Sequence, residues 1–495
     1  MNNPGRIHRA WWMLIGCCLL QGGSLGIVHN CRGIFYAPVI EDLGFGMGAF
    51  TFYVLFFGVC SCIVLPFVGT LFRRIDSRIL LGGASLVFSG TVFAMGFFRT
   101  LPAFYIAGAL QGFAGAFLMF YPAPYILGNW FHKKRGLAVG LAAAFSGIVG
   151  GLGNPLGNAI IRTFGWRAGF FSFGAISLLM MLPVSVFLLR CSPEDVGCRP
   201  YGAEDDEALT GESCPLDGVP ASRAKRESAF WLLILAGLLA SFTCSYCSHL
   251  SPIGIYFGYG SAVGALMVSC SMAGNVVGKL LLGHLYDRFG LRVSLAAGTA
   301  VTAAGYLLLL INSLTARIAG AALYGFSMAT STVMIAIAIR DIYGSRDCGE
   351  LLSYSSMVSA LGTSVNAVII GYMVDGFGRQ RGYIISFWYG LALTLAMGAL
   401  FIVSVRRGRK IAAEYKTGGN AGISFEARFI ASAGDPGDHG APHFHRKHGR
   451  DAGKLPRHEG ARCAPDRAAA QRHVPAYFRH ILPAGQRCLR HRGEL

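Results

Sequence analysis

Two basic side chains stand in stretches of sequence that are otherwise apolar: Arg32 near the amino terminus and Lys279 in the second half. A cation at membrane depth costs roughly 2.5 to 3.5 kcal/mol, so it requires a counter-charge or a water-filled cavity. No carboxylate stands nearby in the sequence at the same depth. Two such cations facing one cavity would bind an anionic solute such as a carboxylate. The structural alternatives are that Lys279 snorkels to the membrane surface and that Arg32 binds backbone carbonyls.

Polar residues at helical spacing accompany both cations. Asn275 and Ser271 lie one and two turns before Lys279 on the same stripe of the helix. Gln21 lies on the face that carries Arg32, and His29 lies beside that face. For the histidine of this group, a proton relay competes with a packed, hydrogen-bonded role. The predicted solute-binding set is Arg32, Lys279, Asn275, Gln21, Ser271 and His29.

The composition indicates which elements position these residues. The chain has 495 residues, of which 53% are hydrophobic and only 14% charged, against roughly 25% charged in soluble domains. Its apolar stretches of about 20 to 27 residues are long enough to cross a hydrocarbon core roughly 30 Å thick. The first stretch lacks a small-residue cleavage site, which predicts a membrane helix in place of a signal peptide. The sequence thus predicts an all-α membrane protein with twelve transmembrane helices, at residues 10–36, 46–70, 79–98, 102–129, 136–161, 167–190, 228–250, 258–284, 292–313, 316–342, 349–373 and 383–405.

The formal net charge is +18, and the distribution of the basic residues along the chain indicates how the protein is oriented in the membrane. Lys and Arg cluster in loops between apolar stretches, about 21 on one side against about 6 on the other, and by the positive-inside rule both termini are cytoplasmic. No nucleic-acid motif accompanies the basic residues. We therefore expect a multi-pass protein of the cell inner membrane, with the lipid bilayer and not nucleic acid as its partner.

One long polar segment, residues 191–227, divides the helices six and six. The sequence predicts an amino-terminal bundle over 1–190, a cytoplasmic linker over 191–227 and a carboxy-terminal bundle over 228–410. Residues 411–495 are rich in His, Arg, Ala, Gly and Pro, which predicts a disordered basic tail; contact with a metal or anionic lipid is the alternative. Cys244 and Cys247 have CxxC spacing inside an apolar stretch, where packing is favoured over metal or redox chemistry.

The two halves repeat a loop motif. The stretch from Gly283 to Arg292 reads Gly-His-Leu-Tyr-Asp-Arg-Phe-Gly-Leu-Arg, and a weaker copy runs from Gly69 to Arg78. Both resemble the signature loop of the major facilitator superfamily, G-x-x-x-D-R-x-G-x-R, at its symmetry-related places. A small residue with an acid and guanidinium groups at helix ends could form a cytoplasmic latch that breaks as the halves rock. The predicted latch residues are Gly283, Asp287, Arg288, Gly290, Arg292, Gly69, Arg74 and Arg78.

A narrower resemblance covers residues 130–142, Trp-Phe-His-Lys-Lys-Arg-Gly-Leu-Ala-Val-Gly-Leu-Ala. This run is similar to the signature of the monocarboxylate transporters. Residues 192–197, Ser-Pro-Glu-Asp-Val-Gly, are similar to the bacterial oxalate:formate antiporters of that family. The acidic Gly-Gly-Trp motif of the family's first helix is present only as Gln-Gly-Gly at 21–23.

The resemblance implies roles for particular residues. In the monocarboxylate transporters, helix 1 carries a substrate-binding lysine, and Arg32 lies within about one residue of that place. Helix 8 of the family carries an Asp and an Arg, whose places Asn275 and Lys279 occupy here. Since that Asp takes part in proton coupling, Asn275 implies weak coupling to protons through this site. The antiporters' helix 11 lysine is missing, which favours a monoanion over a dianion.

These observations predict the major facilitator fold and a secondary transporter of small organic anions, chiefly monocarboxylates, working by alternating access. We expect a monomer that needs neither metal nor cofactor, with a proton or a counter-anion as coupling ion. A drug or metabolite exporter is the alternative, and a membrane-bound sensor is a second one, which counterflow in proteoliposomes would distinguish. No nucleophile–base pair or phosphate loop suggests an enzyme.

Overall fold

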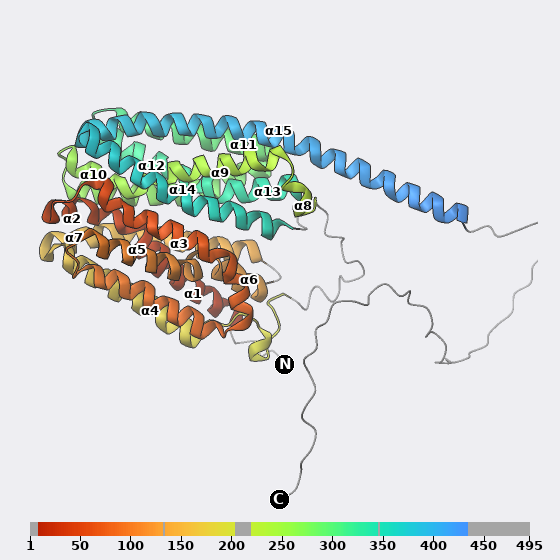
Figure 1. The fold of residues 1–495 in the computed structure, drawn as a ribbon, viewed down its shortest axis with the longest axis horizontal. Coiled ribbons are helices and arrows are strands. Elements are labelled where there is room, and N and C mark those ends of the chain that lie inside the picture. The colour runs from red at the N-terminus through yellow and green to blue at the C-terminus, as the bar shows by residue number, and fades with distance from the viewer. Residues whose placement is uncertain (1–7, 132–133, 203–218, 345–346, 434–495) are drawn as a thin grey trace, which may run out of the picture. The chain divides into compact units, whose positions relative to one another are not determined.

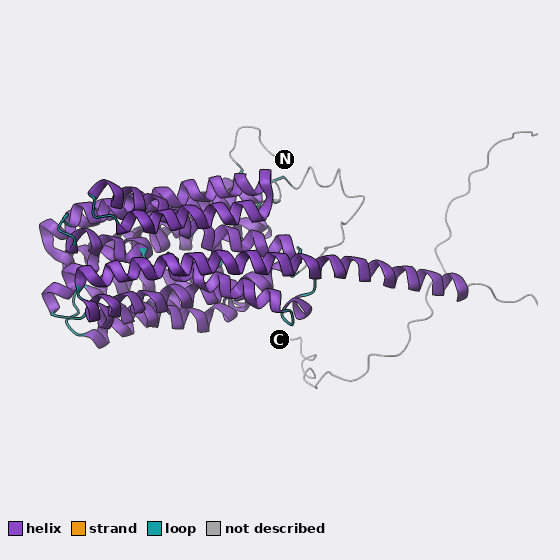
Figure 2. Ribbon diagram, turned by 90° about the horizontal axis from the view of Figure 1, so that it is seen from above, coloured by secondary structure: helices purple, strands orange, loops and turns teal. Residues whose placement is uncertain are grey.

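The computed structural model describes residues 8–131, 134–202, 219–344 and 347–433, where the regular elements are helices (Figure 2). The first half contains α1 Arg9–Gln21, η1 Gly22–His29, η2 Arg32–Phe35, α2 Tyr36–Leu43, α3 Met47–Arg74, α4 Ser77–Met95, α5 Leu101–Gly115, η3 Ala116–Phe120, α6 Pro122–Trp130, α7 Arg135–Pro183 and η4 Val184–Leu188. The linker contributes η5 Glu194–Val196 and α8 Ala221–Ala224. The second half contains α9 Ser228–Cys244, α10 Cys247–Tyr256, α11 Ser261–Leu310, α12 Leu314–Ala329, η7 Thr330–Met334, α13 Ile335–Tyr343, α14 Cys348–Phe377 and α15 Arg379–Ala433.

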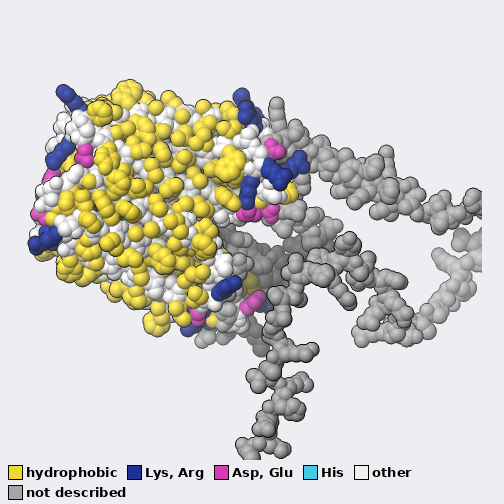
Figure 3. Space-filling view, in the orientation of Figure 1, with side chains coloured by type: hydrophobic (Ala, Val, Ile, Leu, Met, Phe, Trp, Pro, Cys, Tyr) yellow, Lys and Arg dark blue, Asp and Glu magenta, His cyan; other side chains and the backbone are white. Residues whose placement is uncertain are grey.

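Apolar side chains cover the flank of this bundle, while Lys, Arg, Asp and Glu gather at its two ends (Figure 3). Among the exposed residues are Leu152 at 72% and Ile63 at 62%. Ten helical stretches among the described residues are long and apolar enough to cross a membrane. Such a surface is stable in lipid, where a helix satisfies its own backbone groups.

The two longest stretches fold back on themselves. Gly165 in α7 has φ 82° and ψ 167°, and Gly290 in α11 has φ 80° and ψ 176°, values that only glycine adopts readily. The hydroxyl of Ser294 donates to the carbonyl of Leu282 over 2.7 Å. Twelve residues of straight helix would separate them by about 18 Å. Each stretch is therefore a helical hairpin, and the ten apolar stretches found among the described residues include these two hairpins.

The helices of the first half (red to yellow) lie beside those of the second (green to blue) in Figure 1. We call the end that carries Trp130, Arg190 and Ser228 the linker end. The opposite end, with the turns at 44–46, 257–260 and 378, is called the hairpin end. One apolar cluster spans both halves, and two smaller ones lie within the first and the second half.

The start of the linker is anchored on the first half. The backbone N–H of Tyr201 donates to the carbonyl of Trp130 over 2.8 Å, and Asn129 donates to the carbonyl of Cys191 over 3.1 Å. The Tyr201 ring also packs edge-on against Trp11, with ring centroids 5.9 Å apart. The first part of the predicted linker is thus fixed to the half that it leaves.

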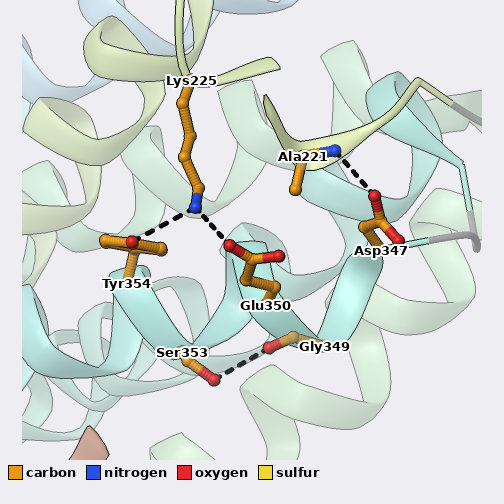
Figure 4. A network of polar contacts seen from close by, with 7 residues as sticks. All are labelled: Ala221, Lys225, Asp347, Gly349, Glu350, Ser353 and Tyr354. Carbon is orange, nitrogen blue, oxygen red and sulfur yellow. Dashed lines mark hydrogen bonds and ion pairs between the residues drawn. The ribbon is translucent and has the colours of Figure 1, made fainter. Parts of the chain in front are cut away.

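The end of the linker is anchored on the second half, as Figure 4 shows. Asp347 accepts from the backbone N–H of Ala221 over 2.8 Å, and Lys225 pairs with Glu350 and donates to the Tyr354 hydroxyl over 3.2 Å. These contacts raise the pKa of Lys225 above its ordinary value. A raised lysine pKa stabilises the docked form at neutral pH, and this contribution is lost only as pH rises through that value in strongly alkaline solution.

The carboxy-terminal prediction differs from the structure. A disordered tail was predicted from residue 411, yet α15 continues to Ala433. Extending an existing helix needs no new nucleus, and the Ala-Ala-Glu stretch at 412–414 favours it. Apart from the last four residues of α15, the helices described above belong to one compact unit, Met1–Phe429; most of the second unit, Ile430–Leu495, lies outside the described residues.

The reversal at Gly290 can be tested by substitution. Replacing Gly290 with Ala should destabilise the protein by about 1 to 3 kcal/mol, because a Cβ is strained in this backbone conformation. Gly283→Ala is the matched control, since a Cβ there meets nothing within 4 Å and the residue is helical. Thermal unfolding in detergent would measure both. Equal midpoints for the two variants would show that Gly290 is not required by the turn.

Candidate functional site

Arg32 lies where the first membrane stretch departs from regular α-helix. Glycines at 22, 23 and 26 are poor helix formers, and the chain there follows a π-helix, η1, and then a 3₁₀ turn, η2, that begins at Arg32. The Arg32 Nε donates to the Ser248 hydroxyl over 2.9 Å. Because Ser248 belongs to α10, this bond joins the two halves.

The residue beside Arg32 permits this contact. A Cβ on Gly33 would lie 2.3 Å from the carbonyl oxygen of Ser248, a distance that no side chain tolerates. Glycine therefore lets η2 and α10 meet backbone to backbone. The guanidinium is half-buried, and no carboxylate of the described residues lies within 4 Å of it.

A small cavity adjoins Arg32. Its volume is about 30 Å³, and its polar lining comes from His29, Arg32, Tyr53 and Gln111. Half of the other ten lining residues are aromatic, namely Phe35, Phe57, Phe88, Phe170 and Phe173. The volume is well below the roughly 300 to 1,000 Å³ of ligand sites, so a solute larger than about two water molecules requires the cavity to widen.

Lys279 and Asn275 lie one helical turn apart on α11. Lys279 is half-buried, and no carboxylate of the described residues lies within 4 Å of its amine. Asn275 is 6% exposed, and its buried Oδ1 accepts no hydrogen bond from the described residues. A buried polar atom without a partner costs about 1 to 3 kcal/mol. This stripe thus carries a cation without a carboxylate partner and a buried acceptor without a donor among the described residues.

Cys244 relates the two cations in space. Its side chain, at the end of α9, lies within electrostatic reach of both Arg32 and Lys279. The two cations come from opposite halves of the molecule, Arg32 from η2 and Lys279 from α11. The predicted site, in which Arg32 and Lys279 bind one solute anion together, requires the two cations to lie close to each other.

The other predicted binding residues take different places. His29 lines the cavity, with its ring 6.0 Å from that of Phe57. Gln21 is buried outside the cavity lining, and its Nε2 donates to the carbonyl of Met119 over 2.9 Å. The Ser271 hydroxyl donates to a carbonyl of its own helix, Val268, over 2.7 Å. The structure therefore brings His29 to Arg32 but leaves Gln21 and Ser271 engaged elsewhere.

The predicted latch is not engaged with the described residues. Asp287, Arg288 and Arg292 are exposed and form no ion pair within 4 Å in the described chain, and Arg288 lies over the ring of Phe289. Gly283 makes no close helix contact, contrary to its predicted role in close packing. A Cβ at Gly283 would meet nothing within 4 Å, so no described neighbour packs tightly against this glycine.

The weaker copy of the motif is built differently. A Cβ on Gly69 would lie 3.1 Å from the Tyr121 hydroxyl, so this glycine does sit against a neighbouring helix. Arg74 and Arg78 are exposed. Asp76 caps α4 by accepting from the backbone N–H of Arg78 over 2.9 Å, which replaces the glycine turn of the second copy.

Sequence reasoning missed Ser248, Tyr53, Gln111 and the place of Cys244. A signal for Ser248 was present, because Ser245, Ser248 and Ser251 recur every three residues in an apolar stretch. Small hydroxyls at that spacing mark a face suited to interhelical hydrogen bonds. Gln111 is the single amide on α5, and Tyr53 lies in an aromatic-rich stretch of α3, so neither gave a repeated polar spacing.

The chain is similar in sequence to a known protein family and to several transporters. The family model described as Major Facilitator Superfamily matches residues 26–269 and 248–432. The MFS-type transporter pynF of Aspergillus niger is 27% identical over 335 residues, covering 64% of this chain and 70% of that protein. Monocarboxylate transporter 12 of Mus musculus is 23% identical over 396 residues, covering 74% of this chain and 80% of its own.

Among solved structures, a bacterial homologue of the human lysosomal transporter Spinster, in an inward-facing and unoccupied conformation, is similar to this fold. The TM-score is 0.61 at 16% identity, over 82% of this chain and 99% of that one. At this identity the likeness concerns the fold alone.

The Arg32–Ser248 bond can be tested by stability. Ser248→Ala should destabilise the protein by about 1 to 3 kcal/mol, because it removes a charge-assisted hydrogen bond from the half-buried Arg32 to the buried Ser248 hydroxyl. Ser24→Ala is the control, since the buried Ser24 hydroxyl bonds only to Leu20 in its own helix. A thermal midpoint for Ser248→Ala as high as that of Ser24→Ala would show that the bond does not join the halves.

Proposed function

Since this chain belongs to the Major Facilitator Superfamily, we propose that it is a secondary active transporter of small organic anions, monocarboxylates above all. The observation that carries the proposal is the pair Arg32 and Lys279, two cations inside the bundle without a carboxylate partner among the described residues. A substrate carboxylate would supply the missing charge. Asn275 Oδ1, without a donor, would orient a polar group of the same solute.

The proposed topology has twelve membrane helices and both termini in the cytoplasm, in a cell inner membrane. Ten apolar stretches, two of them helical hairpins that reverse at Gly165 and Gly290, support this number. The excess of Lys and Arg at the linker end supports the orientation. The linker end is then the cytoplasmic end.

The polar links between the halves support alternating access. They include Arg32 with Ser248, and Ser269, which donates to the carbonyl of Gly151 over 2.6 Å. At the hairpin end, Asp375 accepts from the backbone of α3, and Arg379 pairs with Glu41 at 3.5 Å. These links lie at the middle of the bundle or toward the hairpin end. Transport would require them to break while the cytoplasmic ends close.

The polar residues of α14 support a monoanion. Asn366 donates to the carbonyl of Phe242 over 2.8 Å and to the Ser245 hydroxyl over 2.7 Å, and Ser364 is buried with its hydroxyl on Ala360. These groups are already engaged within the second half. A second carboxylate of the solute would find no further cation there.

A second candidate is an exporter of uncharged aromatic or apolar metabolites. The aromatic lining of the cavity beside Arg32, including Phe35 and Phe173, favours it. Such a carrier would use Arg32 as a structural link to Ser248 and not as a ligand.

The anion site predicts the effect of removing either charge. Arg32→Gln and Lys279→Gln should abolish monocarboxylate counterflow in proteoliposomes, a loss on the order of 100-fold or more, because breaking a buried ion pair costs about 3 to 5 kcal/mol. Membrane insertion should persist in both. Lys225→Gln, which removes a cation at the linker end, is the matched control. Wild-type counterflow in both site variants would end the anion hypothesis, and retained export of uncharged solutes would favour the second candidate.

Asn275 predicts the response to pH. A carrier that must load a proton changes its loaded fraction by up to about tenfold per pH unit. Because Asn275 does not titrate, uptake should change by less than about threefold between about pH 6 and pH 8. Asn275→Asp, which restores an acid, should steepen the profile. A substrate-dependent inward proton current in the unaltered protein would contradict this prediction.

A further inference from the structure

The carboxylate of Asp375 holds the start of α3 across the boundary between the halves. Its Oδ1 accepts from the backbone N–H of Met47 over 2.9 Å, and its Oδ2 accepts from that of Gly48 over 2.7 Å. These are the first two N–H groups of a 28-residue helix, where the aligned peptide dipoles favour a negative charge. Asp375 comes from the last turn of α14, so the cap is supplied by the opposite half.

From this geometry we infer that Asp375 is a second latch, one that keeps the hairpin end closed. It is distinct from the predicted cytoplasmic latch, and "the latch" below means Asp375. The inference rests on alternating access as proposed above, but not on the identity of the solute. Opening the hairpin end must separate α3 from α14, which breaks both charge-assisted hydrogen bonds at once. The latch therefore favours the state that is closed at this end.

Close backbone packing aligns the latch. A Cβ on Gly371 would lie 2.8 Å from the Cα of Gly48 and 2.7 Å from the Thr51 hydroxyl. A Cβ on Gly46 would lie 2.8 Å from the Asp375 carboxylate itself. Small residues on both helices thus bring the acid to the free N–H groups, and Thr51 is fully buried beneath it.

An exposed ion pair lies nearby and contributes less. Arg379 and Glu41 also join the halves, but at 3.5 Å with side chains 58% and 48% exposed. Exposed pairs of this kind contribute little. The bidentate cap by Asp375 is the stronger link at this end because its donors are fixed in the backbone of α3.

The internal repeat places Asp375 at a position equivalent to that of Asp287. Both follow a glycine by four residues and precede a turn glycine by three: Gly371 and Gly378 around Asp375, Gly283 and Gly290 around Asp287. The two acids lie at opposite ends of the bundle. In this state Asp375 is engaged across the halves, while Asp287 forms no ion pair with the described residues.

The latch can be tested by the accessibility of a buried reporter. Thr51→Cys places a thiol under the latch, and its reaction with a hydrophilic maleimide in lipid nanodiscs, open on both sides, reports opening of the hairpin end. Adding Asp375→Ala should speed labelling of residue 51 by about fivefold or more, a typical coupling between linked equilibria. The same background without Thr51→Cys corrects for the native cysteines.

A second carboxylate at the hairpin end, Asp42, serves as the control. Asp42 accepts from the Trp166 indole over 3.0 Å and from Arg167 over 3.1 Å, both within the first half. Asp42→Ala should leave labelling of residue 51 unchanged. Asp375→Asn, which keeps the shape but loses the charge, carries the test if Asp375→Ala does not fold.

The outcomes separate the latch from the proposed function. Faster labelling in the Asp375 variants alone supports the latch, whatever the solute. Unchanged labelling in a folded Asp375 variant, or equal acceleration by Asp42→Ala, overturns it. Loss of counterflow in the Arg32 and Lys279 variants is measured independently and bears only on the anion site.

Discussion

A positive charge inside an apolar bundle must find a counter-charge, and this constraint organises the centre of the molecule. Arg32 and Lys279 meet it incompletely: the former has one hydroxyl partner, Ser248, and neither has a carboxylate among the described residues. The shortage is costly in a low dielectric. Both side chains are half-buried, and Arg32 borders a cavity large enough for solvent. A site that is complete only with an anion bound is thermodynamically coupled to that anion.

The absence of water from the membrane interior also explains the conformation of the backbone. In lipid, each N–H and C=O group needs an internal partner, so the described chain is helical wherever it crosses. Departures from α-helix fall where neighbouring elements are close: η1 beside the cavity, η3 and η7 in corresponding helices of the two halves. Bulges of this kind are frequent at functional sites because they reorient side chains without leaving backbone groups unpaired.

Motion between the halves requires contacts that can be exchanged. The polar links at the hairpin end are few and lie beside tight glycine contacts, while the linker is fixed at each end to a different half. A linker anchored in this way limits how far the two halves separate at that end. Rocking about the centre would then need the exchange of links at the two ends together with the central link between Arg32 and Ser248.

The sequence determined the elements, because apolar length is a local property. The predicted segments 46–70 and 349–373 agree with Met47–Arg74 and Cys348–Phe377 within a few residues. The sequence also identified both central cations, since a charge in an apolar run is visible without any structure. The end of α15 was missed because the extension of an existing helix leaves no apolar signal.

Tertiary structure alone decided the partners. Arg32 and Ser248 are separated by 216 residues, and Asp375 and Met47 by 328. Hydrophobic periodicity shows which face of a helix is polar but not which helix that face will meet. The same limit explains Gln21 and Ser271, which share helical faces with the cations yet bond to Met119 and Val268. A hydrogen bond depends on distances of tenths of an ångström, and these are set by packing between helices that are distant in the chain.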